Sequence, residues 1–123
     1  MKKGIVFAAL TALATLGGPV QAQDYNDGFL AAAAGDYETA VAKWQPLAER
    51  GDANAQFNMA LIYHKGLGVA ADEALAVGWY HRAANNGSPY AQEFLAAAYG
   101  QGWFGLPQDR RLAQYWENRL NQQ

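Results

Sequence analysis

Few side chains in this sequence combine the types and spacings that catalysis or metal binding requires. The two histidines, His64 and His81, lie on different predicted segments, in a chain without cysteine and with no acidic pair beside them. A metal site needs several converging ligands, and a general base must reach the proton that it removes. We therefore predict that neither histidine has such a role, with His64 at an exposed loop edge and His81 on the surface.

The acidic residues recur in a way that indicates helix starts. Asp36, Asp72 and Asp109 are 36 or 37 residues apart, whereas catalytic carboxylates would have to converge on one pocket. An aspartate before a helix accepts a backbone hydrogen bond as its N-cap, and Ser88 before Pro89 fits the same role. Ser88 lacks the context of a nucleophile elbow. The sequence therefore predicts no enzyme, no catalytic residue, no metal and no cofactor.

The first 22 residues have the organisation of a secretory signal peptide. Lys2 and Lys3 precede an apolar run over 5–16, and a helix-breaking stretch ends at the small residue Ala22. The run is too short to span a bilayer. We predict cleavage after Ala22 and export to the periplasm or the medium, with no membrane insertion of the mature chain.

Composition excludes several classes of partner. Without cysteine there is no disulfide framework and no thiolate metal site. The net charge of −2 becomes −4 once Lys2 and Lys3 leave with the leader. Nucleic acid and anionic membrane surfaces both require a basic face, so neither is expected as a partner.

The segment 52–87 forms one complete repeat unit, with partial copies on both sides. Ala55-Gln56 recurs as Ala91-Gln92, Tyr63 as Tyr99, and Trp79 as Trp116. A fixed period of this length indicates stacked supersecondary units that share one core. The predicted organisation is a leader over 1–22, a first hairpin over 23–51, a central repeat over 52–87 and a degenerate capping repeat over 88–123.

Apolar residues recur at helical spacing within each unit. The pattern predicts helices over 28–34, 37–49, 53–63, 73–86, 89–99 and 110–120. No segment alternates with the period of a strand, and Gly66 and Gly68 lie in a loop where positive φ is expected. The predicted fold class is all-α, an α-solenoid of about three antiparallel helix pairs.

The repeat resembles the Sel-one-like repeat, a subclass of tetratricopeptide-like repeats with a longer loop inside each hairpin. The pattern is carried by Ala55-Gln56, Met59-Ala60, Tyr63, Gly66, Gly68-Val69, Asp72, Ala76, Trp79-Tyr80, Ala83-Ala84 and Gly87. The first hairpin looks more like an ordinary tetratricopeptide hairpin. The resemblance implies a right-handed superhelix, and a role as adaptor or scaffold for protein complexes, including many in bacterial envelopes.

In such superhelices the first helix of each pair lines the concave face. The resemblance places there Asn54, Phe57, Asn58, Leu61, His64 and Lys65, followed by Tyr90, Glu93, Phe94, Ala97 and Gln101. This mixture suits an extended peptide. Trp103 and Phe104 lie in a loop outside the repeat pattern, either as interface residues or packed over the end of the solenoid. From this set we select Asn54, Phe57, Asn58, Leu61, Tyr90, Glu93, Trp103 and Phe104 as candidate partner-binding residues.

The expected function is a non-catalytic module of the bacterial envelope that binds a protein or peptide of unknown identity, in an unknown oligomeric state. A second hypothesis is binding of glycan or peptidoglycan fragments, and a third is a β-lactam-related hydrolase. Trp44, Trp79, Tyr80, Tyr115 and Trp116 could line a ligand groove, but repeat positions favour packing between helices. Exposure of Trp79 and Trp116 would favour the glycan hypothesis.

Overall fold

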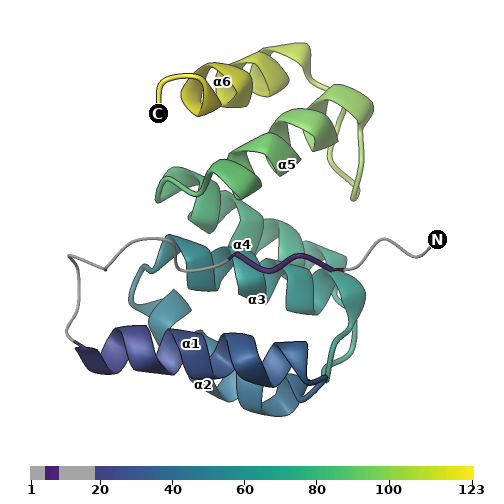
Figure 1. Ribbon diagram of the computed structural model, residues 1–123. Helices are drawn as coiled ribbons and strands as arrows, with labels where there is room; N and C mark the ends of the chain where they lie inside the picture. The colour runs from purple at the N-terminus through teal and green to yellow at the C-terminus, as the bar shows by residue number, and fades with distance from the viewer. Residues whose placement is uncertain (1–4, 9–18) are drawn as a thin grey trace.

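The computed structural model describes residues 5–8 and 19–123 (Figure 1). Within these ranges the chain forms six helices and no strand: α1 (Pro19–Ala33), α2 (Tyr37–Glu49), α3 (Ala53–Lys65), α4 (Glu73–Asn85), α5 (Pro89–Gln101) and α6 (Arg110–Leu120). Each helix packs on the one before it, so that three helix pairs stack along one axis. The predicted all-α solenoid is confirmed. None of the described helices has the length and apolarity to cross a membrane.

Side chains cap five of the six helices, as the repeated aspartates predicted. The carboxylate of Asp72 accepts from the backbone N–H of Leu75 at 3.0 Å, and Asp36 and Asp109 cap α2 and α6 in the same way. The hydroxyl of Ser88 caps α5. Asp52, which was not among the predicted caps, accepts from the backbone N–H of Ala55 at 2.8 Å and caps α3. Each cap satisfies a backbone donor that would otherwise lack a partner at the helix start.

The prediction of a short first helix over 28–34 was wrong. Helix α1 runs from Pro19 to Ala33 and so includes the polar stretch over 23–27, before the predicted start. The reason is Tyr25, whose side chain is buried and whose carbonyl accepts a 3.0 Å hydrogen bond from Trp44 Nε1. Gly28 allows the Trp44 ring to pack closely on α1, since a Cβ at this position would lie only 2.4 Å from Trp44 Nε1.

The predicted leader over 1–22 falls largely on residues 1–4 and 9–18, which lie outside the described residues. Its predicted cleavage site after Ala22 lies near the start of α1 and stays a prediction. Residues 5–8 of the same segment are described, and they contact the solenoid.

The core consists of alanines that allow close helix approach and of large aromatic side chains between them. Trp44, Trp79, Tyr80 and Trp116 are all buried, as packing between helices predicts, and Tyr80 also lines the cavity between α3 and α5. Tyr115 differs, since its side chain is exposed on α6.

The recurring Ala-Gln pair has a clear structural reason. Gln56 Nε2 donates to the carbonyl of Ala48 at 3.0 Å, and Gln92 Nε2 donates to the carbonyl of Ala84 at 3.0 Å. These carbonyls belong to the last turns of α2 and α4, where they also accept backbone hydrogen bonds from Gly51 and Gly87. Each glutamine therefore ties its own repeat to the end of the preceding one.

Candidate functional site

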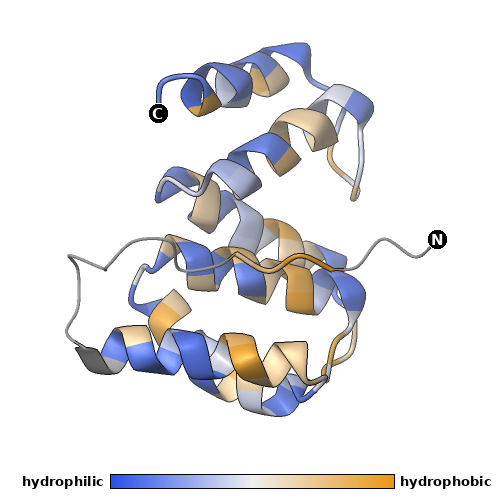
Figure 2. Ribbon diagram, viewed as in Figure 1, coloured by the Kyte–Doolittle hydropathy of each residue, from blue (hydrophilic) through white to orange (hydrophobic). Residues whose placement is uncertain are grey.

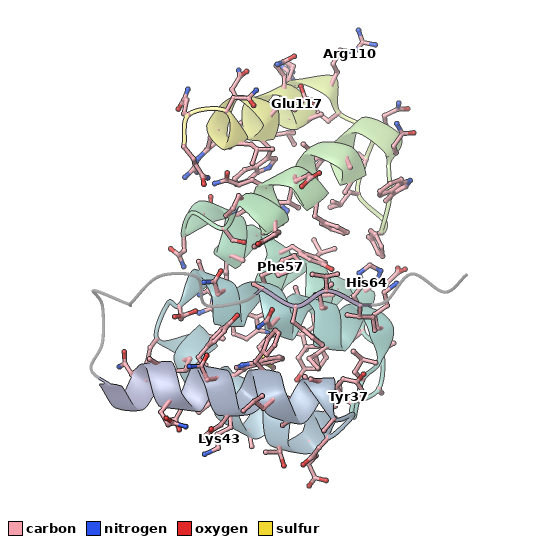
Figure 3. The ribbon with its side chains drawn as sticks, in the orientation of Figure 1. Tyr37, Lys43, Phe57, His64, Arg110 and Glu117 are labelled. Atoms are coloured by element: carbon pink, nitrogen blue, oxygen red, sulfur yellow. The ribbon has the colours of Figure 1, made fainter. Side chains whose placement is uncertain are left out.

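A cavity of about 500 Å³ lies between α3 and α5, on the side of the solenoid that the first helix of each pair lines. Figure 3 shows Phe57 and His64 on the side of α3 that faces α5. The lining residues are Ile5, Val6, Phe57, Leu61, His64, Lys65, Tyr80, Tyr90, Glu93, Phe94, Ala97 and Trp103. The volume and the apolar lining are typical of a ligand or side-chain pocket.

Aromatic rings form the wall of this cavity. Phe57 of α3 stacks on Tyr90 of α5, with the ring centroids 5.4 Å apart. Tyr80 of α4 stacks on Phe94 of α5 at 3.8 Å. Rings that hold each other across three helices have little rotamer freedom left, so the wall is formed before any partner arrives.

His64 is part of this wall, and its predicted place at an exposed loop edge was wrong. Its side chain is half-buried, and its Nδ1 lies 2.9 Å from the hydroxyl oxygen of Tyr80. The centroids of the His64 and Phe104 rings are 4.3 Å apart. Burial lowers the pKa of His64, with Lys65 adding to the effect, and burial raises the pKa of Tyr80. At neutral pH the hydrogen bond between His64 and Tyr80 therefore joins two uncharged side chains.

His81 is not a fully exposed surface residue either. Its Nε2 lies 3.1 Å from the hydroxyl of Tyr99, and burial lowers its pKa. Within the described residues, no group of three or more His, Cys, Asp and Glu side chains is placed to hold a metal ion. The hydroxyl of Ser88 is buried and engaged as a helix cap, so it is not placed as a nucleophile.

The two loop aromatics have different surroundings. Trp103 is 48% exposed and stands at the rim of the cavity. Phe104 turns inward to contact His64 and Phe94, with a positive φ of 58°. A bulky residue rarely adopts this backbone conformation, which costs about 1–3 kcal/mol. The ring of Phe104 is therefore held against the histidine by its loop.

The structure brings together most of the residues that the resemblance selected. Phe57, Leu61, Tyr90, Glu93 and Trp103 all line the cavity. Among the other three, Phe104 packs behind the wall, Asn58 is buried beside residues 5–8, and Asn54 is half-buried outside the cavity lining. Their part in partner binding stays a prediction.

Residues 5–8 make contacts that the sequence did not predict. The backbone N–H of Ala8 donates to Asn58 Oδ1 at 2.7 Å, and the Tyr25 hydroxyl donates to the Ala8 carbonyl. Phe7 packs on Trp44 with a centroid distance of 5.0 Å. A tyrosine within a polar stretch gave no sign of this role, and residues 5–8 were explained as part of a leader. Asn58, an amide between apolar neighbours on the predicted concave helix, was the one available signal.

Comparison with known proteins agrees with this architecture. The chain is 27% identical to a Sel1 repeat protein from Oxalobacter formigenes, whose crystal structure superposes with a TM-score of 0.69 over 95% of this chain and 98% of the other. It is 30% identical to c5321, a protective antigen of uropathogenic Escherichia coli with an SLR fold, at a TM-score of 0.71 over 83% of this chain and 22% of that protein.

A curated relative comes from a plant. The chain is 31% identical over 78 residues to the ERAD-associated E3 ubiquitin-protein ligase component HRD3A of Arabidopsis thaliana. The match spans 63% of this chain but only 12% of that protein, so it compares repeats and not whole proteins.

Two segments, 53–88 and 89–116, match the Sel1 repeat, and together they make up just over half of the chain. Sel1 repeats generally mediate interactions between proteins, and the proteins that contain them are typically non-catalytic scaffolds. With this match, the six stacked helices and the glutamine contacts between repeats, the chain belongs to the Sel1 repeat family.

Proposed function

We propose that this chain is a non-catalytic interaction module of the bacterial cell envelope, which binds a protein or peptide through the cavity between α3 and α5. The observation that carries the proposal is the rim of this cavity, where Tyr90 and Trp103 are 44% and 48% exposed over a preformed aromatic wall. Half-exposed aromatics around an apolar hollow are typical of interaction hot spots.

The envelope location rests on different support. Lys2 and Lys3, the apolar run after them and Ala22 have the organisation of an export signal. The Oxalobacter formigenes and Escherichia coli proteins, to whose crystal structures the chain is similar, are bacterial. Export places the module in the periplasm or the medium.

Glycan binding has less support. Trp79 and Trp116 are only 8% and 4% exposed, so the tryptophans that would stack on sugar rings are enclosed between helices. The wall of the cavity consists of phenylalanine and tyrosine rings that stack on one another. Such a wall suits an inserted side chain of a protein or peptide partner better than a sugar ring.

The test uses the full-length chain as bait in envelope extract, after mild cross-linking and with identification of the captured protein by mass spectrometry. The purified partner is then titrated against the wild-type chain and against a Tyr90→Ser/Trp103→Ser double variant. We expect the affinity to fall by at least about tenfold, because removing hot-spot aromatics typically costs 1 kcal/mol or more each.

The control is Tyr115→Ser, since Tyr115 is exposed to 47% but lies on α6, outside the cavity lining. The Tyr115→Ser variant should bind the purified partner with the same affinity as the wild type. Equal affinities for the double variant and the control would exclude the cavity as the binding site. Failure to capture any protein would contradict the proposed function itself.

A further inference from the structure

Residues 5–8 cross α3 as a stretched segment between α1 and α5 (Figure 1). They form no helix or strand, and their side chains are apolar (Figure 2). Two hollows flank the segment. Ile5 and Val6 border the cavity between α3 and α5, and Phe7 borders a second hollow with Phe29 and Tyr37. The path of the segment is thus continuous with the proposed binding cavity.

The solenoid holds the backbone of this segment at Ala8. Asn58 Oδ1 accepts from the Ala8 N–H at 2.7 Å, and Asn58 Nδ2 lies 3.4 Å from the Ala8 carbonyl. The Tyr25 hydroxyl donates to the same carbonyl and accepts from Asn58 Nδ2 at 3.0 Å. An amide that pairs with both backbone groups of one residue recognises extended chain without regard to its side chain.

Asn58 and Tyr25 are both buried, so their polar groups need these partners. Asn58 has no exposed surface, and Tyr25 is 1% exposed. Burial raises the pKa of the Tyr25 hydroxyl, which keeps it neutral and able to donate. A buried amide without a partner costs about 1–3 kcal/mol, which favours occupation of the groove by some backbone segment.

The side chains of the segment show what the groove selects. Phe7 enters an aromatic pocket, with ring centroids 5.0 Å from Trp44 and 6.5 Å from Tyr37. Ala8 is 1% exposed, which leaves no space for a longer side chain. Val6 is 76% exposed, so we expect its identity to contribute little to binding in the groove. The groove therefore fits an aromatic residue followed by a small one.

We propose that this groove, defined by Tyr25, Tyr37, Trp44 and Asn58, is a site for an extended partner peptide with an aromatic residue followed by alanine or glycine. Residues 5–8 occupy it as an internal stand-in, and the site opens when they are displaced or removed. This inference rests on the proposed function, because it names the peptide chemistry that the module takes beside its cavity.

The test titrates a synthetic peptide with the sequence of residues 4–10 against the full-length chain. Phe7→Asp removes the aromatic anchor of the internal segment and frees the groove. This variant should bind the peptide at least about tenfold more tightly than the wild type, whose tethered segment competes at a high effective concentration. In the Phe7→Asp background, Asn58→Leu should weaken peptide binding by about tenfold or more, because both backbone contacts are lost.

The matched control in that background is Asn118→Leu, an amide on α6 bonded to Gln114. It should leave peptide affinity unchanged. Circular dichroism of each variant shows that the six helices persist. If Asn58→Leu unfolds the chain, Tyr25→Phe replaces it, since this variant removes only the hydroxyl that donates to the peptide carbonyl.

Altered peptides test the selection independently of the protein variants. A peptide with alanine in place of phenylalanine should not bind, and one with leucine at the Ala8 position should not bind either. A peptide with lysine at the Val6 position should bind as tightly as the original. Equal binding of all three peptides would overturn the inference, as would equal affinity of the wild type and Phe7→Asp.

The two proposals fail in different ways. If the captured partner depends on Tyr90 and Trp103 while peptide binding does not depend on Asn58, the groove is not a peptide site and the module function stands. If the peptide requires Asn58 but no protein is captured, the groove stands and the partner-binding role of the cavity is rejected.

Discussion

The loop between α3 and α4 and the loop between α5 and α6 begin and end in the same way, but they make different contacts. In each, a glycine with φ near +70° ends the first helix: Gly66 at 67° and Gly102 at 71°. In each, the backbone N–H of the next capping aspartate donates to a tyrosine carbonyl at 2.9 Å, from Asp72 to Tyr63 and from Asp109 to Tyr99. The repeat therefore specifies how both loops begin and end.

Between these fixed points the loops diverge. The central loop lies against α2, since a Cβ on Gly68 would be 3.0 Å from Tyr37 Cβ and 3.3 Å from the Glu38 nitrogen. The C-terminal loop has one residue more than the central loop between its glycine and its capping aspartate. It directs Phe104 toward His64 and leaves Trp103 half exposed. Both loops therefore contact the hairpin before them, and the C-terminal loop also presents an exposed aromatic side chain at the rim of the cavity.

The largest expected effect tests the packing difference between the loops. Gly68 and Gly105 both have positive φ, 69° and 71°, but a Cβ on Gly105 would meet nothing within 4 Å. Gly105→Ala should lower the free energy of unfolding by about 1 kcal/mol, the cost of the backbone conformation alone. Gly68→Ala should cost about 2–3 kcal/mol, because the new methyl group also displaces the backbone of α2.

Urea unfolding of both variants measures this difference. Equal losses of stability would show that the central loop does not depend on its contact with α2. The slope of the transition should stay the same in both, since neither substitution changes the surface exposed on unfolding.

Much of this frame could be predicted from sequence, and the exceptions have physical causes. The helix starts followed from Asp36, Asp72 and Asp109, because N-capping is a local interaction between neighbours in sequence. The burial of Trp79 and Trp116 followed from repeat spacing. The contacts of Tyr25 with Ala8 and of Phe104 with His64 join residues far apart in sequence, and no periodicity reports them.

A second, intermediate effect concerns the backbone at Phe104. Glycine adopts positive φ without strain, so Phe104→Gly should be more stable than Phe104→Ala by about 1 kcal/mol. Trp103 does not have a positive φ. At this position the order of stability should reverse, with Trp103→Gly less stable than Trp103→Ala. Thermal unfolding of the four variants checks this. The same order at both positions would show that Phe104 is not held in the left-handed region.

The smallest expected effect is a loss of stability in mild acid. Burial holds the pKa of His64 below its ordinary value of 6.5, and Lys65 adds to this while Glu73 opposes it. As pH falls through 6.5, the unfolded chain takes up more protons at this residue than the folded chain, so stability is complete above 6.5 and declines below it. His81 has the same sign. The pKa of Asp36 lies below 3.8, so its carboxylate affects stability only in stronger acid.

We therefore expect the unfolding temperature to drop between about pH 7.5 and about pH 5, and the drop to be smaller in His64→Gln. Phe104→Gly uncovers the ring and should move the pKa of His64 toward 6.5, which NMR titration of the imidazole measures directly. Because Phe104 belongs to the C-terminal loop, a shift in that variant would show that this loop sets the electrostatics of the cavity wall. An unchanged pKa would show that Phe104 does not contribute to the shift, which would then come from the other side chains that bury the ring and from Lys65.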